Sequence, residues 1–430
     1  MRDPLLTASE PTRRAVLTGA AQALFGLSLL SLPTPGWSDE PASIETGPRF
    51  PAKRLIMLSM AGGMSHLDTL DPKPGTEQAG PVKAIAGAAD GVQLSEYLPN
   101  LAKMTKHCAV VRSLTSTQGA HETGTYLMRT SFQPRGTIIH PTMGAWMSHF
   151  AGRDNPTLPA YIGVNIGGGH PGAGYLDAKD GPMPVTADSG LANSIRPSSV
   201  TVGQFDRRIQ LLKAMDGRFA ATFDQKAVKS YGSIYDEAVS LMSSKDLDAF
   251  NLSQESPTLR AAYGDTAFGR GCLLARRLIE HDVRAVEVVL GGWDTHDDNF
   301  DRVADQALIL DAALPALLAD LDARGLLDET LVVVNTEFGR TPRISERVGR
   351  DHFPKAFSCL LAGAGIRRGI AYGATDATGS EVVSGKLSIP DFNCTIAHAL
   401  GLPWQRTVIS PSGRPFTLAD KGKPALDLLA

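Results

Sequence analysis

Three short apolar runs in this chain are each followed by side chains that bind metal ions, and this pattern constrains the fold most. The runs and the residues that follow them are 55–58 with Asp68, 284–290 with Asp294 and His296, and 331–336 with Glu337. Strands of an open α/β sheet present their functional side chains at their carboxyl ends. The three runs therefore predict buried strands whose ends converge on one site.

Segments with helical periodicity separate these strand-like runs. The predicted helices span residues 94–107, 121–130, 141–150, 202–214, 227–243, 268–281, 303–324 and 389–400, and the further strands 53–60, 108–113, 158–165 and 356–361. Strands that alternate with helices favour parallel pairing, so we expect an α/β fold with a doubly wound, mostly parallel sheet. The more polar stretch 181–263 is predicted to be a helical insertion or cap on that sheet.

The N-terminus has the features of an export signal. Arg13 and Arg14 precede the apolar run 20–30, and small residues near Ser38 fit a cleavage site. We therefore expect a twin-arginine signal peptide over residues 1–38, a linker over 39–52 and the folded domain over 53–430. The twin-arginine export machinery would be a partner, and the mature protein would be periplasmic or secreted. An uncleaved anchor is the alternative, although the apolar run is shorter than the roughly 20 residues that span a bilayer.

Composition excludes several classes of function. The net charge is −3 and no basic stripe is present, which argues against a nucleic-acid partner. The four cysteines are scattered without CxxC spacing, so neither a cysteine-rich zinc site nor a dithiol redox centre is expected. No GxGxxG follows a strand-like run, which disfavours a dinucleotide-dependent oxidoreductase.

The sequence around Asp294 and His296 favours a metal site. In an extended segment, residues two apart point the same way, so both side chains can reach one ion. Carboxylate and imidazole ligands suit zinc, manganese or iron. Glu337 at another strand end adds a carboxylate, and nearby Arg340 is suited to contact an anionic oxygen. The alternatives are a polar turn after the strand and a Glu–Arg salt bridge.

Two other histidines are candidates, His352 for the same metal site and His121 for a nucleophile or anion site. His352 lies just before the strand-like run 356–361 and would contribute if its loop folds back toward the others. His121 opens the predicted helix 121–130, where free N–H groups and the helix dipole favour negative charge. Thr117 and Thr123 are the hydroxyl groups in this segment, and helix capping by Ser116 or Thr117 is the simpler interpretation.

Taken together, the motifs resemble a known bacterial family. They are the twin-arginine start, Gly62-Gly63-x-Ser65-His66-x-Asp68-x-x-Asp71-Pro72, Gly292-Trp293-Asp294-Thr295-His296, Thr336-Glu337-Phe338-Gly339-Arg340 and Gly349-Arg350-Asp351-His352. This set is similar to the exported family named domain of unknown function 1501, which is related to the alkaline-phosphatase-like superfamily of sulfatases and phosphatases. The resemblance covers nearly all of the mature chain and implies an alkaline-phosphatase-like fold.

The resemblance also implies roles for individual residues. Asp68, Asp294, His296, Glu337 and His352 would be metal ligands, and the metal would be a divalent ion, zinc or manganese. Phe338 stands where the superfamily has a second ligand, which implies that one metal site is impaired. The position of the superfamily's nucleophile falls near His121, with Thr117 and Thr123 as the hydroxyl alternatives.

The sequence therefore predicts an exported metal-dependent hydrolase of phosphate or sulfate esters, acting on an anionic ester of a glycan or lipid. His121 or a nearby threonine would occupy the attacking position, and Arg340 would hold the anion. The alternative is a catalytically inactive relative that serves as an envelope binding or assembly protein. Phe338 and the missing hydroxyl nucleophile favour this second interpretation.

Overall fold

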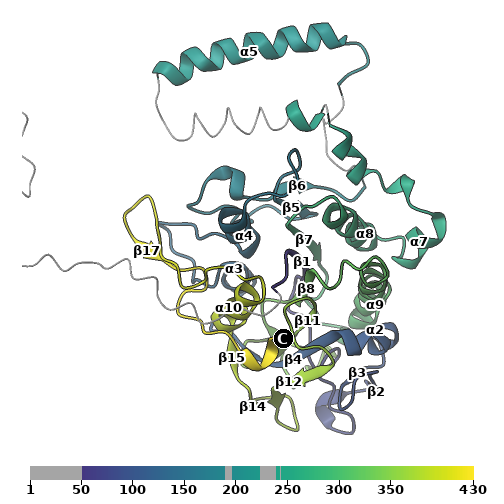
Figure 1. Ribbon diagram of the computed structural model, residues 1–430. Helices are drawn as coiled ribbons and strands as arrows, with labels where there is room; N and C mark the ends of the chain where they lie inside the picture. Colours follow the sequence, from purple (N-terminus) through teal and green to yellow (C-terminus); the bar gives the residue numbers. More distant parts are fainter. Residues whose placement is uncertain (1–50, 189–195, 223–238, 243) are drawn as a thin grey trace, which may run out of the picture. The chain divides into compact units, whose positions relative to one another are not determined.

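A nine-stranded sheet forms the centre of the protein. The computed structural model describes residues 51–188, 196–222, 239–242 and 244–430 (Figure 1), which belong to one compact unit, Gly47–Ala430. The predicted signal peptide and nearly all of the linker lie outside the described residues. In order across the sheet the strands are β12 (Ile370–Tyr372), β4 (Cys108–Thr115), β11 (Phe357–Gly363), β8 (Thr330–Asn335), β1 (Arg54–Met60), β7 (Ala285–Leu290), β5 (Tyr161–Val164) and β6 (Met183–Val185), with β15 (Leu387–Ser388) paired to β4.

Strand direction determines which loops meet. Strands β8, β1, β7, β5 and β6 are parallel, and Leu58 of β1 lies opposite both Val288 of β7 and Val334 of β8. β11 runs antiparallel to its neighbours β4 and β8. The start of β11 therefore lies at the same edge of the sheet as the carboxyl ends of β4, β8, β1 and β7. Loops from distant parts of the sequence come together at this edge.

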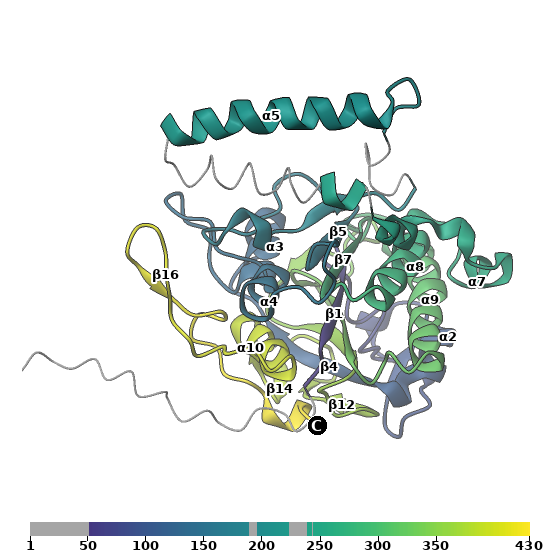
Figure 2. The ribbon, with the colours of Figure 1, turned by 45° about the horizontal axis from the view of Figure 1, so that its top comes forward.

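Helices cover both faces of the sheet (Figures 1 and 2). Along β1, Ile56, Leu58 and Met60 join one hydrophobic core, and Leu55 and Met57 join the other. The first core contains residues of α2 (Pro99–Met104), α8 (Ala267–Glu280) and α9 (Asn299–Ala323), and the second contains residues of α3 (His121–Thr130), α4 (Met143–Ala151) and α10 (Ile389–Ala399). A strand buried on both faces has no polar side to alternate with, which explains its continuous apolar sequence. The predicted doubly wound α/β fold is confirmed.

Two predicted segments differ from the structure. The expected helix over residues 94–107 is divided into β3 (Gln93–Ser95) and the short helix α2, because Pro99 disfavours helical backbone in the residue before it and so begins the helix. Stretch 181–263 contains α5 (Val202–Thr222) and α7 (Pro257–Ala262), but it also supplies β6, the edge strand of the main sheet. Most of the predicted helix 227–243 lies outside the described residues. The domain boundaries remain a prediction.

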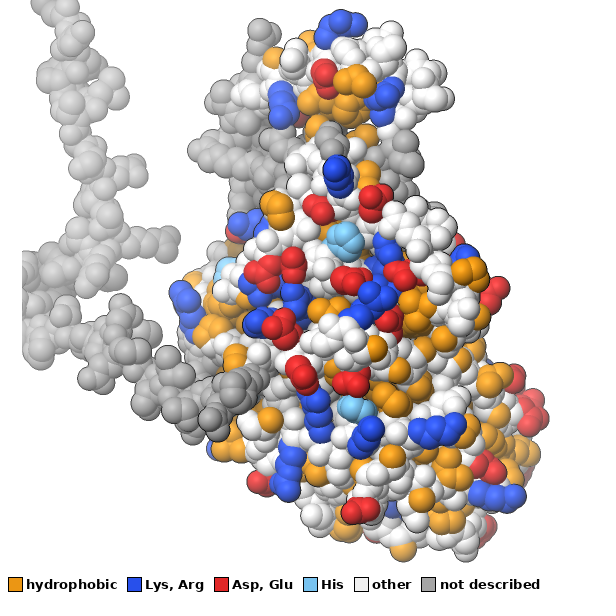
Figure 3. Space-filling model, turned by 45° about the vertical axis from the view of Figure 1, so that its right-hand side comes forward, with side chains coloured by type: hydrophobic (Ala, Val, Ile, Leu, Met, Phe, Trp, Pro, Cys, Tyr) orange, Lys and Arg blue, Asp and Glu red, His pale blue; other side chains and the backbone are white. Residues whose placement is uncertain are grey.

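The surface charge and the state of the cysteines concern two functions considered above, nucleic-acid binding and cysteine-based metal or redox sites. On the face drawn in Figure 3, acidic and basic side chains are interspersed, without a large area of one sign. All four cysteines are buried as free thiols. Of the helices in the described part of the chain, none is long and apolar enough to cross a membrane.

One histidine, His140, is buried in an aromatic cluster and gives a testable pH effect. The ring of Phe132 stacks on it with the centroids 4.2 Å apart, and Tyr126 Oη is 2.8 Å from its Nδ1. Burial lowers the pKa of His140 to about 4, whereas an unfolded histidine titrates near 6.5. As the pH falls from about 6.5 to about 4, the unfolded state takes up a proton that the native state does not. The contribution of neutral His140 to stability is therefore lost across this range.

We expect wild-type protein to lose about 2 kcal/mol more unfolding free energy than His140→Gln when the pH is lowered from 7 to 4.5. Urea denaturation of both proteins at the two pH values measures this difference. Equal losses in the two proteins would contradict the assignment of a depressed pKa to His140.

Candidate metal centre

Four side chains from three parts of the sequence converge at the carboxyl edge of the sheet. Asp294 and His296 follow β7, His352 begins the short strand β10 (His352–Phe353) just before β11, and His121 is the first residue of α3, after β4. Asp294 Oδ1 lies 3.1 Å from His296 Nε2 and 3.3 Å from both His121 Nε2 and His352 Nε2. The Nε2 atoms of His296 and His352 are 3.0 Å apart. Ligand atoms of His121, Asp294 and His352 thus all lie within 4.8 Å of one another, and His296 adjoins this cluster through Asp294 and His352.

The other ring nitrogen of each histidine has an acceptor of its own. His121 Nδ1 is 2.8 Å from Glu337 Oε1, His296 Nδ1 is 3.1 Å from Asp351 Oδ1, and His352 Nδ1 is 2.7 Å from the Gly119 carbonyl oxygen. We assign the proton of each ring to Nδ1 on this basis, which leaves the Nε2 lone pairs directed at the centre. Histidines that bind metals are held in this way by a carboxylate or carbonyl on their second nitrogen.

The spacing of the ligand atoms fits a metal ion. Ligands at about 2.0–2.1 Å from a tetrahedral zinc ion are about 3.3–3.4 Å from each other, and the distances from Asp294 Oδ1 to the three Nε2 atoms, 3.1–3.3 Å, are close to this value. His121 Nε2 is buried and faces Asp294 Oδ1 at 3.3 Å, so an ion between the two atoms would satisfy both. The side chains are 24–46% exposed. A further ligand such as water or substrate can therefore reach the centre.

Arg340 holds Asp294 and is not available to hold a substrate anion. Its guanidinium is fully buried, donates through Nε to the Gly63 carbonyl at 2.9 Å, and contacts the Asp294 carboxylate and the Gly62 carbonyl through Nη2. Burial opposes ionisation of Asp294, but the hydrogen bond and charge of Arg340 outweigh it and keep the pKa of this carboxyl well below its usual range. The structure therefore brings Arg340 to the centre as a group that positions a ligand.

Glu337 lies behind the centre. Its Oε1 accepts hydrogen bonds from His121 and, at 2.9 Å, from the Gly62 amide, and its side chain is 5% exposed. The bond to Glu337 raises the pKa of His121. Gly62 has φ of 119°, and a Cβ there would lie 2.5 Å from the Asp294 amide nitrogen, so only glycine permits this close approach. The sequence predicted Glu337 as a ligand, but the structure places it behind His121, where it orients that imidazole.

Asp68, the remaining predicted ligand, is engaged elsewhere. Both of its oxygens accept from the Arg350 guanidinium, at 2.8 and 2.9 Å, and Oδ2 also accepts from Ser65 at 2.6 Å and Asn299 at 2.8 Å. Asp68 and Arg350 are both fully buried. Since the lone pairs of the carboxylate are already occupied, the structure does not bring Asp68 to the centre.

Phe338 and the hydroxyl candidates also have defined positions. The buried Phe338 ring packs against His121 and His352, with centroids 5.1 and 4.6 Å away. An aromatic ring therefore packs against two of the converging histidines, at the position where the sequence predicts that a metal ligand is missing. Thr123 donates to the Ala120 carbonyl, and exposed Thr117 lines a neighbouring hollow. Among the described residues, neither hydroxyl is hydrogen-bonded to the four converging side chains.

A second buried network, missed from the sequence, holds α3 against the sheet. Glu287, in the middle of β7, accepts from Arg129 of α3 at 2.7 Å, from Tyr161 at 2.8 Å and contacts His170 Nε2 at 2.9 Å. Burial opposes its ionisation, but the charge of Arg129 keeps the pKa of Glu287 far below its usual range. In the sequence, the sign of this network is a single carboxylate inside an otherwise apolar strand. The network fixes the helix that begins with His121.

Replacing Glu337 by glutamine tests its role behind His121. We expect zinc affinity to fall about 10- to 100-fold, because outer-shell partners of metal-bound histidines contribute this much. A competition titration with a chromophoric chelator measures the change. Glu329→Gln, which alters an exposed carboxylate paired with Lys53, is the matched control. Loss of affinity equal to that of a ligand variant would instead identify Glu337 as a direct ligand.

The chain belongs to the family of proteins of unknown function DUF1501, whose family model matches residues 52–429. A comparison with curated proteins finds no match. Solved structures that resemble the chain include the lipoteichoic acid synthase LtaP from Listeria monocytogenes, at 9% identity over 83% of this chain and 74% of that chain, with a TM-score of 0.36. The PsFucS1 sulfatase from Pseudoalteromonas sp. has 13% identity over 83% and 69%, with a TM-score of 0.39. Alkaline phosphatase from the Antarctic bacterium TAB5 has 12% identity over 82% and 99%, with a TM-score of 0.38.

Proposed function

We propose that this DUF1501 protein is a hydrolase of phosphate or sulfate esters that depends on one divalent metal ion, zinc or manganese. The observation that carries the proposal is the convergence of three imidazole Nε2 atoms and one carboxylate oxygen, each imidazole oriented by an acceptor on Nδ1. His121, Asp294, His296 and His352 would hold the ion. Nitrogen and oxygen ligands of this kind suit zinc, manganese and iron.

A bound ion would supply positive charge for an ester oxygen and lower the pKa of a water molecule. The chain's own residues prepare this chemistry. Glu337, Asp351 and the Gly119 carbonyl keep the imidazoles in one tautomer, and Arg340 fixes Asp294 as an anion. α3 has no side-chain cap at Ala120, so its first N–H groups and its dipole favour negative charge beside His121.

The proposed setting is outside the cytoplasm. The twin-arginine motif at Arg13 and Arg14 supports export through the twin-arginine machinery to the periplasm or the exterior. The substrate would be an anionic ester carried by a glycan or lipid. These assignments rest on the sequence motif and on the chemistry of the centre.

A second candidate is a metal-binding envelope protein without catalysis. Phe338 in place of a second ligand favours it, as does the absence of a hydroxyl nucleophile from contact with the centre among the described residues. In this alternative the ion stabilises the fold around the site, and a binding partner takes the place of a substrate.

Hydrolysis of aryl phosphates, aryl sulfates and a phosphodiester distinguishes the two candidates. We expect the protein loaded with zinc or manganese to hydrolyse at least one of these classes, and chelation followed by metal replacement to abolish and restore the activity. A protein that retains its ion and hydrolyses none of them would contradict the hydrolase proposal and favour the binding role.

A further inference from the structure

A large hollow lies beside the metal centre. Its volume is about 930 Å³, the size of a site for an extended ligand rather than for a single phosphate or sulfate group. A second hollow of about 260 Å³ shares Phe132, Arg135 and Asp420 with the first. The two hollows therefore adjoin at these residues, and we refer to them together as the groove.

Two segments of the chain run from the groove to the metal centre. Thr115 and Thr117 line the hollow, and the same segment continues to Gly119, whose carbonyl holds His352. Lys355 also lines the hollow and follows His352 by three residues, so their Cα atoms are at most about 11 Å apart. The groove therefore begins within a few residues of the metal centre, a distance that an extended ligand can span.

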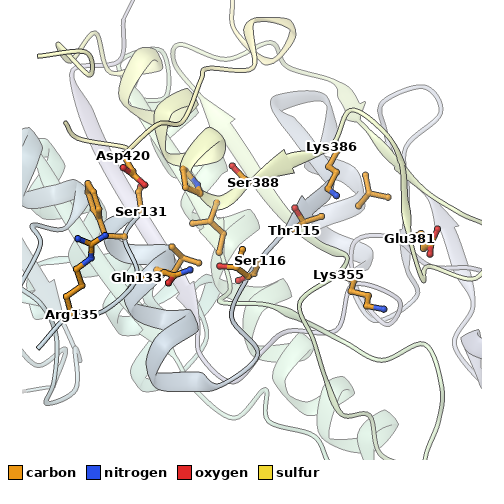
Figure 4. A pocket seen from close by; sticks show the side chains of 16 residues that line it. Thr115, Ser116, Ser131, Gln133, Arg135, Lys355, Glu381, Lys386, Ser388 and Asp420 are labelled. Atoms are coloured by element: carbon orange, nitrogen blue, oxygen red, sulfur yellow. The ribbon is translucent and has the colours of Figure 1, made fainter. Parts of the chain in front are cut away.

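Basic side chains are distributed along the groove. Lys355 and Lys386 lie at one end with Glu381, and Arg135 lies at the other end with Asp420 (Figure 4). Lys421 lines the second hollow. These four basic side chains are exposed, and none forms an ion pair with another described residue. They outnumber the two acidic lining residues, Glu381 and Asp420, on a chain whose net charge is −3.

We infer that this groove binds a polyanionic chain that carries phosphate or sulfate groups at repeated intervals, with one ester at the metal centre and further anionic groups along the lysines and Arg135. The inference rests on the proposed function for the position of the reacting ester. The groove supplies the length and the separated positive charges that a single small ester does not need. The substrate that we infer is therefore an anionic polymer that carries the reacting ester.

Binding of defined polyanions to the full-length, metal-loaded protein tests this inference. The probes are a short-chain inorganic polyphosphate and a size-fractionated dextran sulfate, which separate phosphate from glycan-borne sulfate, measured by isothermal titration calorimetry. We expect Lys355→Gln/Lys386→Gln to weaken binding of the preferred probe about tenfold and to reduce its dependence on salt. Lys83→Gln/Lys106→Gln removes two exposed lysines outside the groove and should bind as wild type does.

Equal affinity in the groove variant and wild type would overturn the inference, and so would failure of wild type to bind either probe. Because wild type and the groove variant have the same metal centre, a difference in their affinities reports on the groove alone. A failure of the hydrolase proposal shows instead as bound metal without ester hydrolysis.

Discussion

Replacing Asp294 by alanine is expected to lower zinc affinity by about 100- to 1,000-fold and to abolish metal-dependent ester hydrolysis. Four-ligand zinc sites bind with about 10–16 kcal/mol in total, so each ligand accounts for roughly a quarter of this free energy. Asp294 Oδ1 is the atom that the Nε2 atoms of all three histidines share, at 3.1–3.3 Å. Its loss removes both a ligand and the negative charge that neutralises the ion.

A second ligand variant separates metal loss from a folding defect. Asp294→Ala leaves the buried Arg340 without its carboxylate, which itself destabilises the protein. His352→Ala removes a ligand without exposing a buried charge and should lose metal to a similar extent. Asp297→Asn alters a neighbouring exposed carboxylate that pairs with Arg302 and should retain both metal and activity. Wild-type zinc affinity in the two ligand variants would refute the proposed ligand set.

Replacing Asp68 by alanine is expected to lower the unfolding free energy by about 3–5 kcal/mol. Breaking a buried ion pair leaves an uncompensated charge in the interior, and here Arg350 would lose both of its hydrogen bonds to the carboxylate. Ser65 and Asn299 would each lose an acceptor as well. Urea denaturation measures the effect, and Asp68→Ala/Arg350→Met should recover part of the loss because no buried charge remains.

The metal content of Asp68→Ala distinguishes the two roles considered for this residue. A structural role predicts that the folded fraction binds one ion as wild type does. A protein that keeps wild-type stability but loses its metal would show that Asp68 is a ligand after all.

Periodicity was sufficient to predict most of the fold. Helix α3 begins at His121 and ends at Thr130 as expected, and β1, β7 and β8 match the apolar runs within about one residue. Apolar runs and helical stripes are local signals, so a single sequence reveals them. The small strands β12 and β15 were missed because two or three residues carry no periodicity.

Part of the candidate site followed from spacing alone. Asp294 and His296 are two residues apart in an extended segment, and their side chains do meet. The position of His352 depends on β11 running antiparallel, a property of the tertiary pairing that the local sequence does not encode. His121 was expected near the reacting position, and the structure brings its Nε2 to the same carboxylate as the other two rings.

The charged residues show the limit of reasoning from residue type. Asp68, Glu337 and Arg340 have the chemistry of ligands or anion contacts, yet each has a buried protein partner instead. Whether a carboxylate faces an ion or a guanidinium depends on which loop lies opposite. Arg350 reaches Asp68 across 282 positions of sequence, and no local pattern predicts such a pairing.

Elemental analysis of the protein, purified without chelator and then dialysed against zinc or manganese, tests the single metal centre most directly. The account predicts one ion per chain in wild type and little or none in Asp294→Ala and His352→Ala. Two ions per chain, or one ion that is retained by both variants, would show that metal binds elsewhere in the protein. A folded wild-type protein that binds neither metal would contradict the proposal of a metal centre.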